Sequence, residues 1–424
     1  MNSRSRSHRR WLVVLCMLLL GAAGVAFMGA VLWPGFQLPQ PSGPFGVGTQ
    51  RHEWTDAGRQ EIFSADPAAR RTLVAQIWYP ADVPASAAPE PYVADADVLA
   101  VQLARLQHVP SVLFSNLGRI RSNAVTDAHP APGRWPVLLF LEGATGFRQM
   151  NSYQVEALVS HGYVVVAIDQ PYTAAAVVFS DGRQAHGLPL PVLRPLIQSS
   201  YLPDPPTAAI LGRSMPGDAL IRYLADDVSF VLTQLALLDT GSAAGVLKGA
   251  LALDRLGVLG VSLGGIVAAQ VCQASPQIRA CLLMDAPMPA QAVQNGLRQP
   301  AMWLTRDADT MRLERQQSGG WPEYEIAAQL GSTASVLQQQ RTEAGYLVRM
   351  AGLFHIDLTD VPSWSPLYRW LGYAGPIGIE RAHALVNAYS LAFFDRHLKD
   401  RPSPLLTPEG APSGASLERY GPVD

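Results

Sequence analysis

Residues Arg255-Leu-Gly-Val-Leu-Gly-Val-Ser-Leu-Gly-Gly-Ile-Val-Ala-Ala-Gln270 decide the fold of this chain. An apolar run at 256–259 meets Gly260-Val-Ser-Leu-Gly264, and a helix-compatible run follows from Ile266. This order predicts a strand, a tight turn and a helix, the context of a G-x-S-x-G nucleophile elbow that presents a serine at a sheet edge. The glycines are needed because a Cβ at either position would collide with neighbouring backbone. An ordinary Gly-rich turn can have the same sequence pattern, so the interpretation depends on the rest of the chain.

The composition is that of a folded, mildly acidic protein. Of the 424 residues, 48% are hydrophobic, which allows a large core and excludes global disorder. The length allows two or three domains, but an α/β fold with insertions accommodates most of it as one. The formal charge is −2, and the four arginines within residues 1–10 contribute +4, so the remainder carries −6. This balance argues against nucleic acid as a partner.

The N-terminal stretch 11–33 contains no charged residue. As a helix it would reach roughly 34 Å, enough to cross a bilayer. The basic arm 1–10 should stay in the cytoplasm, so we expect a single-pass membrane protein whose remainder lies in the periplasm or extracellular space. A cleaved signal peptide is the alternative, because 21–26 offers small residues, and it would give a secreted protein. Arg9-Arg10 also resembles a twin-arginine export signal.

The chain has three cysteines, of which Cys16 lies within the apolar stretch. Cys272 and Cys281 are therefore the remaining pair for a disulfide in an oxidising compartment, and two buried free thiols are the alternative. No spacing typical of metal ligands occurs, so we expect neither a metal site nor a cofactor.

Short apolar runs separated by helical patterns predict the architecture of the remainder. The runs 136–141 and 163–168 are predicted as buried strands and 151–161 as the helix between them, which makes a right-handed βαβ unit with parallel strands. Further strands are predicted at 72–79, 256–260, 280–284, 301–305 and 346–350, and helices at 218–238 and 379–398. This alternation predicts an α/β fold with a mostly parallel central sheet flanked by helices.

The segments outside these elements complete the domain plan. Residues 34–47 are rich in Pro and Gly and are predicted as a linker, followed by an α/β domain over 48–400. Residues 172–215 interrupt the alternation with a long Pro-rich segment, which we interpret as a wall or cap over the site. The tail 401–424 is rich in Pro, Gly and Ser and is predicted to be flexible.

A serine nucleophile needs a base that is itself oriented by a carboxylate, in the chain order Ser, acid, His for this fold. The histidines that follow Ser262 are His355, His383 and His397. The last two fall within the predicted C-terminal helix, whereas His355 comes just after a strand. A loop at that place would bring its side chain to the sheet edge of the serine, so His355 is the predicted base.

The acid has more than one candidate. Asp285 directly follows strand 280–284, Asp309 follows the next strand, and Asp307 is a weaker option. A solvated turn carboxylate is the alternative for each of them, with Arg306 as an ion-pair partner for Asp307 or Asp309. The residue pattern by itself leaves this choice open.

The oxyanion formed during acyl transfer needs two hydrogen-bond donors. We expect one to be the backbone N–H of Leu263, directly after the serine. The other should be the N–H of Ala144, in the loop Glu142-Gly-Ala-Thr-Gly-Phe-Arg148, where Gly143 and Gly146 allow close approach to a substrate. A plain turn between a strand and a helix is the alternative for that loop.

Together these segments resemble the platelet-activating-factor acetylhydrolase-like branch of the α/β-hydrolases, whose relatives include dienelactone-hydrolase-like and polyester-cleaving enzymes. The resemblance spans residues 48–400. The segments that carry it are Trp78-Tyr79-Pro80, Gly143 to Arg148, Ser160-His-Gly-Tyr-Val164, Gly260-Val-Ser-Leu-Gly-Gly265, Leu283-Met-Asp-Ala286, His355-Ile-Asp-Leu-Thr-Asp-Val-Pro362 and Asn387-Ala-Tyr-Ser-Leu-Ala-Phe-Phe-Asp-Arg-His-Leu-Lys399.

The resemblance ranks the two acids. In that family the acid follows the strand after the nucleophile, which implies Asp285, whereas polyester-cleaving and dienelactone-type relatives carry it one strand later, which implies Asp309. Two positions depart from the family pattern: Val261 stands where His is frequent, and Glu142 stands where His often precedes the glycine. Neither change removes a catalytic group, but Glu142 could place a carboxylate near the pocket and alter which substrates are tolerated.

The sequence thus predicts a serine carboxylic-ester hydrolase with Ser262, Asp285 and His355 as its triad. The resemblance implies short-chain acyl esters, lipid-like or polyester-like, and an outward-facing anchor would suit substrates at a membrane surface. One alternative is acyl transfer to an alcohol by the same triad, which needs a site dry enough to exclude water. Another is a non-catalytic binding protein on a hydrolase scaffold, which should have a broken triad.

Overall fold

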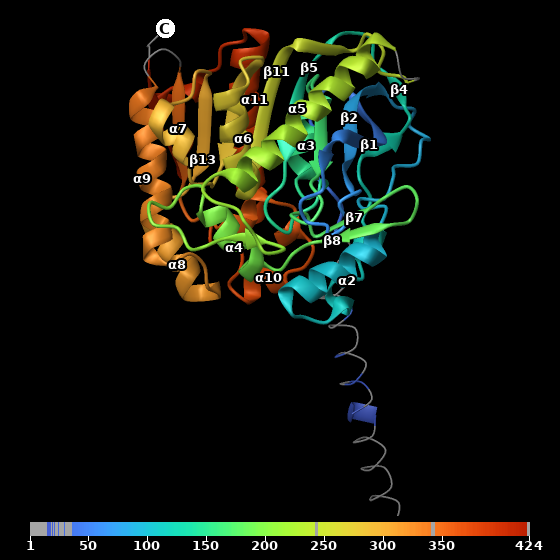
Figure 1. The fold of residues 1–424 in the computed structure, drawn as a ribbon. Coiled ribbons are helices and arrows are strands. Elements are labelled where there is room, and N and C mark those ends of the chain that lie inside the picture. The colour runs from blue at the N-terminus through green and yellow to red at the C-terminus, as the bar shows by residue number, and fades with distance from the viewer. Residues whose placement is uncertain are drawn as a thin grey trace, which may run out of the picture.

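The structure, a computed structural model, describes residues 36–241, 245–340 and 344–421, together with 15–17, 19, 21, 24 and 29. Its centre is a large sheet with the strand order β15-β14-β13-β12-β11-β5-β6-β2-β1-β3, and β4 pairs with β2 (Figure 1). The strands from β14 to β6 in this order are parallel, whereas β15, β2 and β1 join by antiparallel pairing. The predicted α/β fold with a mostly parallel central sheet is therefore confirmed.

The strands of this sheet are β1 (Gly46–Gln60), β2 (Arg70–Asp82), β3 (Ala124–Thr126), β4 (His129–Pro130), β5 (Trp135–Leu141), β6 (Val164–Asp169), β11 (Leu251–Val261), β12 (Ile278–Met284), β13 (Ala301–Thr305), β14 (Gly345–Met350) and β15 (Ala415–Tyr420). The helices are α2 (Ala96–Gln107), α3 (Ser152–Ser160), α4 (Leu190–Gln198), α5 (Ala219–Thr240), α6 (Leu263–Ala274), α7 (Ala290–Asn295), α8 (Ala308–Ser318), α9 (Glu323–Gln339), α10 (Leu367–Trp370) and α11 (Ile379–Lys399).

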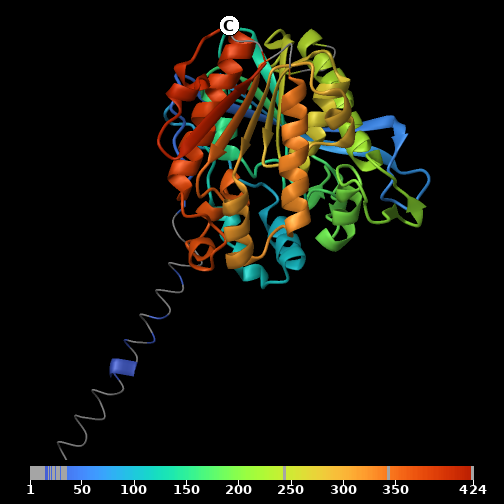
Figure 2. The same ribbon diagram turned by 90° about the vertical axis from the view of Figure 1, so that its left-hand side faces the viewer.

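Helices cover both faces of the sheet, which is why its central strands are apolar on both sides. In β5, Leu138 and Phe140 belong to the core cluster beneath α3 and α11. Their neighbours Val137 and Leu139 belong to the opposite cluster, beneath α5 and α6. Side chains alternate between the faces of a strand, so a continuous apolar run fills both cores at once. Figure 2 shows the sheet between α11 on one side and the α5 and α6 layer on the other.

The strands and helices that the sequence predicted are present, with shifted ends. The predicted strand 256–260 belongs to the longer β11, and the predicted helix 218–238 is α5. Gly162 ends the turn after α3 with φ +87°, a conformation that suits glycine. Asn151 precedes α3 without capping it through its side chain, which donates instead to Gln154 Oε1 and to the carbonyl oxygen of Leu358.

Two segments that were predicted outside the folded domain, the linker 34–47 and the flexible tail 401–424, are packed against it, so both predictions are wrong for the residues described. In the tail 401–424, residues 415–420 form β15, which pairs with β14 and buries Leu417. In the predicted linker 34–47, Leu38 is 3% exposed, and the Phe45 ring lies 4.9 Å from that of Trp135. The Pro and Gly content was a misleading signal, because each segment also contains apolar side chains that are buried against the domain, Leu38 and Val47 in the first and Leu406 and Leu417 in the second.

The N-terminal predictions concern residues that are largely outside the description. The arm 1–10 is entirely outside it, and so is most of 11–33. Within the described part of the chain, no helix combines the length and the apolar character needed to cross a bilayer.

The segment 172–215 carries small elements of its own. These are the hairpins β7 (Ala176–Val178) with β8 (Gln184–His186) and β9 (Ala209–Ile210) with β10 (Arg213–Ser214), and the helix α4 between them. Figure 1 places α4 at the lower end of the domain with α2, α8 and α10. The loops that follow β5, β11, β12 and β14 contribute to the same region, as the cavities described below demonstrate.

Candidate active site

Ser262 occupies the sharp turn between β11 and α6. Its backbone has φ 57° and ψ −121°, a conformation that costs about 1–3 kcal/mol for a residue with a side chain. The flanking glycines make the turn feasible. A Cβ on Gly260 would lie 2.2 Å from the carbonyl oxygen of Gly264, and a Cβ on Gly264 would lie 2.0 Å from that of Leu141. The turn therefore has the local geometry of a nucleophile elbow.

His355 and Asp285 are joined by a short hydrogen bond between His355 Nδ1 and Asp285 Oδ2, 2.6 Å long. Asp285 directly follows β12, and His355 begins the 3₁₀ turn His355–Leu358 after β14. The Asp285 side chain is fully buried, whereas the His355 side chain is 23% exposed. Ser262 and His355 line the same two cavities, although no hydrogen bond joins their side chains among the described residues.

Asp285 is held by three further side chains. Gln329 Nε2 donates to its Oδ1 over 2.8 Å, Thr305 Oγ1 donates to the same oxygen over 3.3 Å, and Arg306 Nε lies 3.0 Å from its Oδ2. Burial would by itself raise the pKa of Asp285, but the charge of Arg306 and the bond to His355 outweigh it and hold that pKa well below its ordinary value. The carboxylate is therefore ionised at neutral pH.

The other acid candidates lie elsewhere. The Asp309 side chain is 94% exposed and pairs with Arg312. Asp307 caps α8, because its Oδ1 accepts a hydrogen bond from the backbone N–H of Thr310 over 2.7 Å. The alternative in which Arg306 pairs with Asp307 or Asp309 is not found, since the Arg306 side chain points inward to Asp285 and Glu314.

The loop after β5 lies directly beside the serine. A Cβ on Gly143 would approach the Ser262 Cβ to 3.2 Å, and Ala144 lines both cavities. Within the described chain, the backbone N–H groups of Ala144 and Leu263 donate to no protein acceptor. Leu263 is the first residue of α6, where N–H groups have no partner in the helix itself. Both donors that the sequence predicted are thus free to bind a ligand atom.

Glu142 lies behind this loop and lines neither cavity, so the expectation that it places a carboxylate at the pocket is wrong. Its side chain is buried, and its Oε1 accepts a hydrogen bond from the backbone N–H of Gln170 over 3.1 Å. Burial, aided by the neighbouring Asp169, raises the pKa of Glu142 well above its ordinary value. The residue therefore ties the loop to the end of β6.

Two cavities meet at the serine. One has a volume of about 440 Å³ and is walled by Leu190, Arg194 and Ile197 of α4. The other has a volume of about 360 Å³ and is lined by Met150 and Tyr373. The residues common to both are Ala144, Ser262, Gly320, Trp321 and His355. A ligand centred on the serine can therefore extend in two directions.

Several residues of the site were not predicted from the sequence. Trp321, in the turn between α8 and α9, packs edge-on against His355 with ring centroids 4.6 Å apart. The Arg306 guanidinium lies over the same indole, 4.9 Å from its centroid. Gln329 comes from α9 and Glu314 from α8, neither of which the sequence analysis recognised as a helix. A Gly-Gly-Trp-Pro turn was the one local signal available.

The His355 loop is fastened to the helix that follows the loop after β5. Asp360 accepts hydrogen bonds from the backbone N–H groups of Ser152 and Tyr153, over 2.7 and 3.2 Å. Tyr92 also donates to this carboxyl group, over 3.1 Å. Burial raises the pKa of Asp360 well above its ordinary value. This link fixes the two loops that border the second cavity relative to each other.

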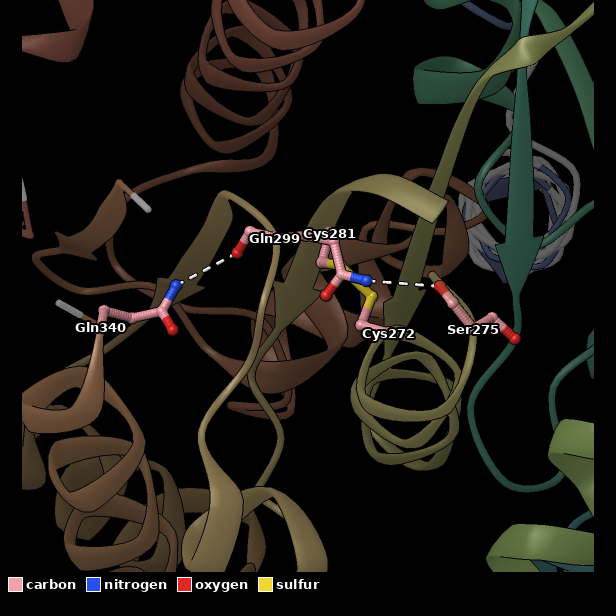
Figure 3. The surroundings of a disulfide bond; sticks show 5 residues. All are labelled: Cys272, Ser275, Cys281, Gln299 and Gln340. Atoms are coloured by element: carbon pink, nitrogen blue, oxygen red, sulfur yellow. Dashed lines mark hydrogen bonds between the residues drawn. A yellow bond between two sulfur atoms is a disulfide. The ribbon is translucent and has the colours of Figure 1, made fainter. Parts of the chain in front are cut away.

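A disulfide joins Cys272, near the end of α6, to Cys281 in β12 (Figure 3). Of the two alternatives that the sequence left open, the structure therefore contains the disulfide. Gln299 donates to the carbonyl oxygen of Ser275 beside it, over 3.3 Å. The bond connects the helix that begins after Ser262 to the strand that ends just before Asp285.

Known proteins resemble this chain at three levels. The family model for platelet-activating factor acetylhydrolase, isoform II, matches residues 31–187. A probable 1-alkyl-2-acetylglycerophosphocholine esterase of Arthroderma benhamiae is 27% identical over 297 residues, which cover 67% of this chain and 66% of that relative. The solved ferulic acid esterase of Streptomyces cinnamoneus superposes with a TM-score of 0.66 at 27% identity, covering 90% of this chain and 99% of its own.

The names of these relatives indicate a carboxylic-ester hydrolase, and the fold and the elbow agree with that class. The chain spans just under two thirds of the curated relative, whereas it spans nearly all of the solved esterase. In its family-model match, its curated relative and its fold, the chain is similar to proteins of the platelet-activating-factor acetylhydrolase-like branch of the α/β-hydrolases.

Proposed function

We propose that this chain hydrolyses carboxylic esters through a triad of Ser262, His355 and Asp285. The observation that carries the proposal is the 2.6 Å hydrogen bond between His355 and an ionised, buried Asp285, in a cavity that Ser262 of the elbow also lines. An intact carboxylate–imidazole pair beside an elbow serine is the arrangement that serine hydrolysis requires. It argues against a binding protein with a degraded site.

The chemical steps follow from which atoms are engaged. Because Nδ1 of His355 is bonded to Asp285, Nε2 takes the proton of Ser262 as Oγ attacks the ester carbonyl carbon. The N–H groups of Leu263 and Ala144 stabilise the resulting oxyanion. The imidazolium then returns its proton to the departing alcohol, leaving an acyl-enzyme. Water, deprotonated by His355, attacks this ester, and the acid product leaves as the serine is regenerated. No cofactor takes part.

The substrates that we propose are short-chain acyl esters, including lipid-like ones. The two cavities support this choice, because an ester centred on Ser262 needs separate space for its acyl and alcohol portions. The names of the relatives add an acetylated glycerophospholipid and esters of ferulic acid as compounds to assay. A polyester-like substrate can be assayed in the form of a soluble ester oligomer, with the same enzyme.

We also propose that the catalytic domain lies outside the cytoplasm, anchored through residues 11–33. The uncharged length of that stretch, its basic flank and the disulfide Cys272–Cys281 support this location. In membranes of cells that produce the full chain, alkaline carbonate should leave the protein in the pellet. A mature N-terminus near residue 27, read by mass spectrometry, would instead establish a cleaved signal peptide and a secreted enzyme.

The test of the activity is hydrolysis of p-nitrophenyl acetate, butyrate and decanoate by the detergent-solubilised full chain. Ser262→Ala and Asp285→Asn should each lose about 10⁴-fold or more in kcat, whereas the exposed Asp309→Asn should stay within about twofold. If Asp309→Asn alone loses turnover, the acid is Asp309, which follows the next strand, and not Asp285. Absence of turnover by folded wild-type protein on every ester would refute the hydrolase. Transfer to added alcohol in preference to water would favour an acyltransferase.

A further inference from the structure

Arg306 places a positive charge directly against the acid of the proposed triad. It follows β13, its side chain is fully buried, and its Nε lies 3.0 Å from Asp285 Oδ2. In a serine hydrolase the acid orients the imidazole and stabilises the imidazolium that forms during the reaction. A guanidinium at this distance partly cancels the negative charge of Asp285. Arg306 by itself would therefore weaken the stabilisation of the imidazolium by Asp285.

Glu314 supplies the compensating charge. Its Oε2 accepts a hydrogen bond from Nη1 of Arg306 inside the protein, and its side chain is 9% exposed. The other oxygen, Oε1, accepts a hydrogen bond from the backbone N–H of His355 over 3.3 Å. The carboxylate also lines the second cavity. One side chain of α8 thus contacts both the cation behind the acid and the residue that acts as the base.

These contacts form a chain of alternating charge from Asp285 through Arg306 to Glu314, which closes on His355. Its fixed charges sum to the single negative charge of a simple Asp–His pair. Breaking one buried ion pair is costly, whereas neutralising both partners at similar volume is often tolerated. A pair of this kind, placed against catalytic groups, therefore predicts an effect on the base as well as on stability.

We propose that Arg306 and Glu314 are positioning residues for the triad: Arg306 fixes Asp285, and Glu314 restores beside His355 the negative charge that Arg306 withdraws. This inference rests on the proposed function, since it assigns roles relative to His355 as the base. It adds one residue that follows β13 and one from α8 to a site otherwise built from residues that follow β11, β12 and β14. Trp321, packed on both His355 and Arg306, covers the contact from the cavity side.

The sign of each charge effect on the base is fixed by position. Asp285 and Glu314 favour the imidazolium, and Arg306 disfavours it. Within the His355 turn, burial raises the pKa of Asp357 to about 6, and its carboxyl group accepts hydrogen bonds from the backbone N–H groups of Phe354 and Gly375. The other titratable groups that line the two cavities are Arg194, Tyr201, Glu325 and Tyr373. They are present in every variant below, so they cancel in the comparison.

The experiment compares Arg306→Met, Glu314→Gln and the double variant by kcat/KM for p-nitrophenyl acetate between pH 5 and 9. Glutamine keeps the acceptor for the His355 N–H and removes only the charge. The acid limb of the profile should move up by about one pH unit in Arg306→Met and down by about one unit in Glu314→Gln. The double variant should return close to the wild-type profile. Arg312→Met, which removes an exposed ion pair on α8, is the matched control and should leave the acid limb of the pH profile unchanged.

Opposite shifts in the two single variants, with recovery in the double, support the proposal, because a purely structural role moves both profiles in one direction or neither. The proposal is overturned if the acid limbs of the two single variants are unchanged or shift in the same direction. Should Arg306→Met fail to fold by circular dichroism, Glu314→Gln still decides, since Arg306 keeps its pairing with Asp285 there. Loss of turnover in the wild type would refute the hydrolase instead, so the two failures are distinct.

Discussion

Replacing Gly264 by alanine tests the elbow most directly. The added Cβ would lie 2.0 Å from the carbonyl oxygen of Leu141 and 2.7 Å from that of Glu142, both backbone atoms. Ordinary contact needs about 3.4 Å, so the first turn of α6 and the loop after β5 must separate by more than about 1 Å. Overpacking of this kind costs about 1–3 kcal/mol of unfolding free energy.

That separation acts on catalysis because the proposed oxyanion donors sit on the two segments that must part. Ala144 lies on the loop and Leu263 on the first turn of α6. A misplacement of about 1 Å at reacting groups lowers the rate by about 10²-fold, so kcat for p-nitrophenyl acetate should fall by about that factor. KM should change less, because the cavity walls on α4 are not displaced.

The control is Gly331→Ala in α9, where no atom lies within 4 Å of the added Cβ. It should leave kcat unchanged and raise the unfolding free energy by up to about 1 kcal/mol. Both variants are compared with the wild type by steady-state kinetics and thermal melting. Wild-type kcat in a folded Gly264→Ala protein would show that the elbow and the loop are not tightly packed, and the placement of the oxyanion site would then be mistaken.

Three further predictions follow from the packing. Trp321→Ala should join the two cavities and raise the ratio of kcat/KM for the decanoate ester over the acetate ester by about tenfold; an unchanged ratio would show that the indole does not divide them. The double change of Cys272 and Cys281 to alanine should lower the unfolding free energy by about 2–3 kcal/mol, measured by urea titration, with activity kept; an unchanged midpoint would contradict it. Burial raises the pKa of Glu156 to about 7, above its value in the unfolded chain, so stability should fall as pH rises from 5 to 7; Glu156→Gln should flatten that slope in melting curves, and an equal slope would oppose the assignment.

Local patterns were sufficient for the parts of the site that one short segment determines. The elbow at Ser262 is specified by its own glycines and flanking runs, and His355 by its place after a strand. The acid was different. Asp285 and Asp309 both follow parallel strands, and no local feature separates them, because the difference arises in three dimensions: one side chain is fully buried against His355 and the other is 94% exposed.

The partners of the acid depend on tertiary structure even more strongly. Arg306 follows β13, whereas Glu314 and Gln329 come from α8 and α9, and their sequence neighbours carry no motif. An arginine near two aspartates suggested a local ion pair, but burial turned it toward a residue 21 positions earlier. The edge strand β15 was missed for a related reason, since the pairing partner that makes a short polar segment a strand lies about 70 residues away in β14.

The two cavities have different origins in the chain. The second is lined by the same loops that hold the proposed catalytic groups, including Met150 and Ile356, so we expect substitutions there to lower activity. The first is also lined by the proposed triad, but one of its walls comes from α4, inside an insertion that supplies none of the triad. If the proposed function holds, we expect exchange of residues 172–215 to change the preference for one half of an ester while the reaction is preserved. For protein engineers, the proposed function then implies a catalytic part that must be kept and an insertion that can be exchanged to select substrates.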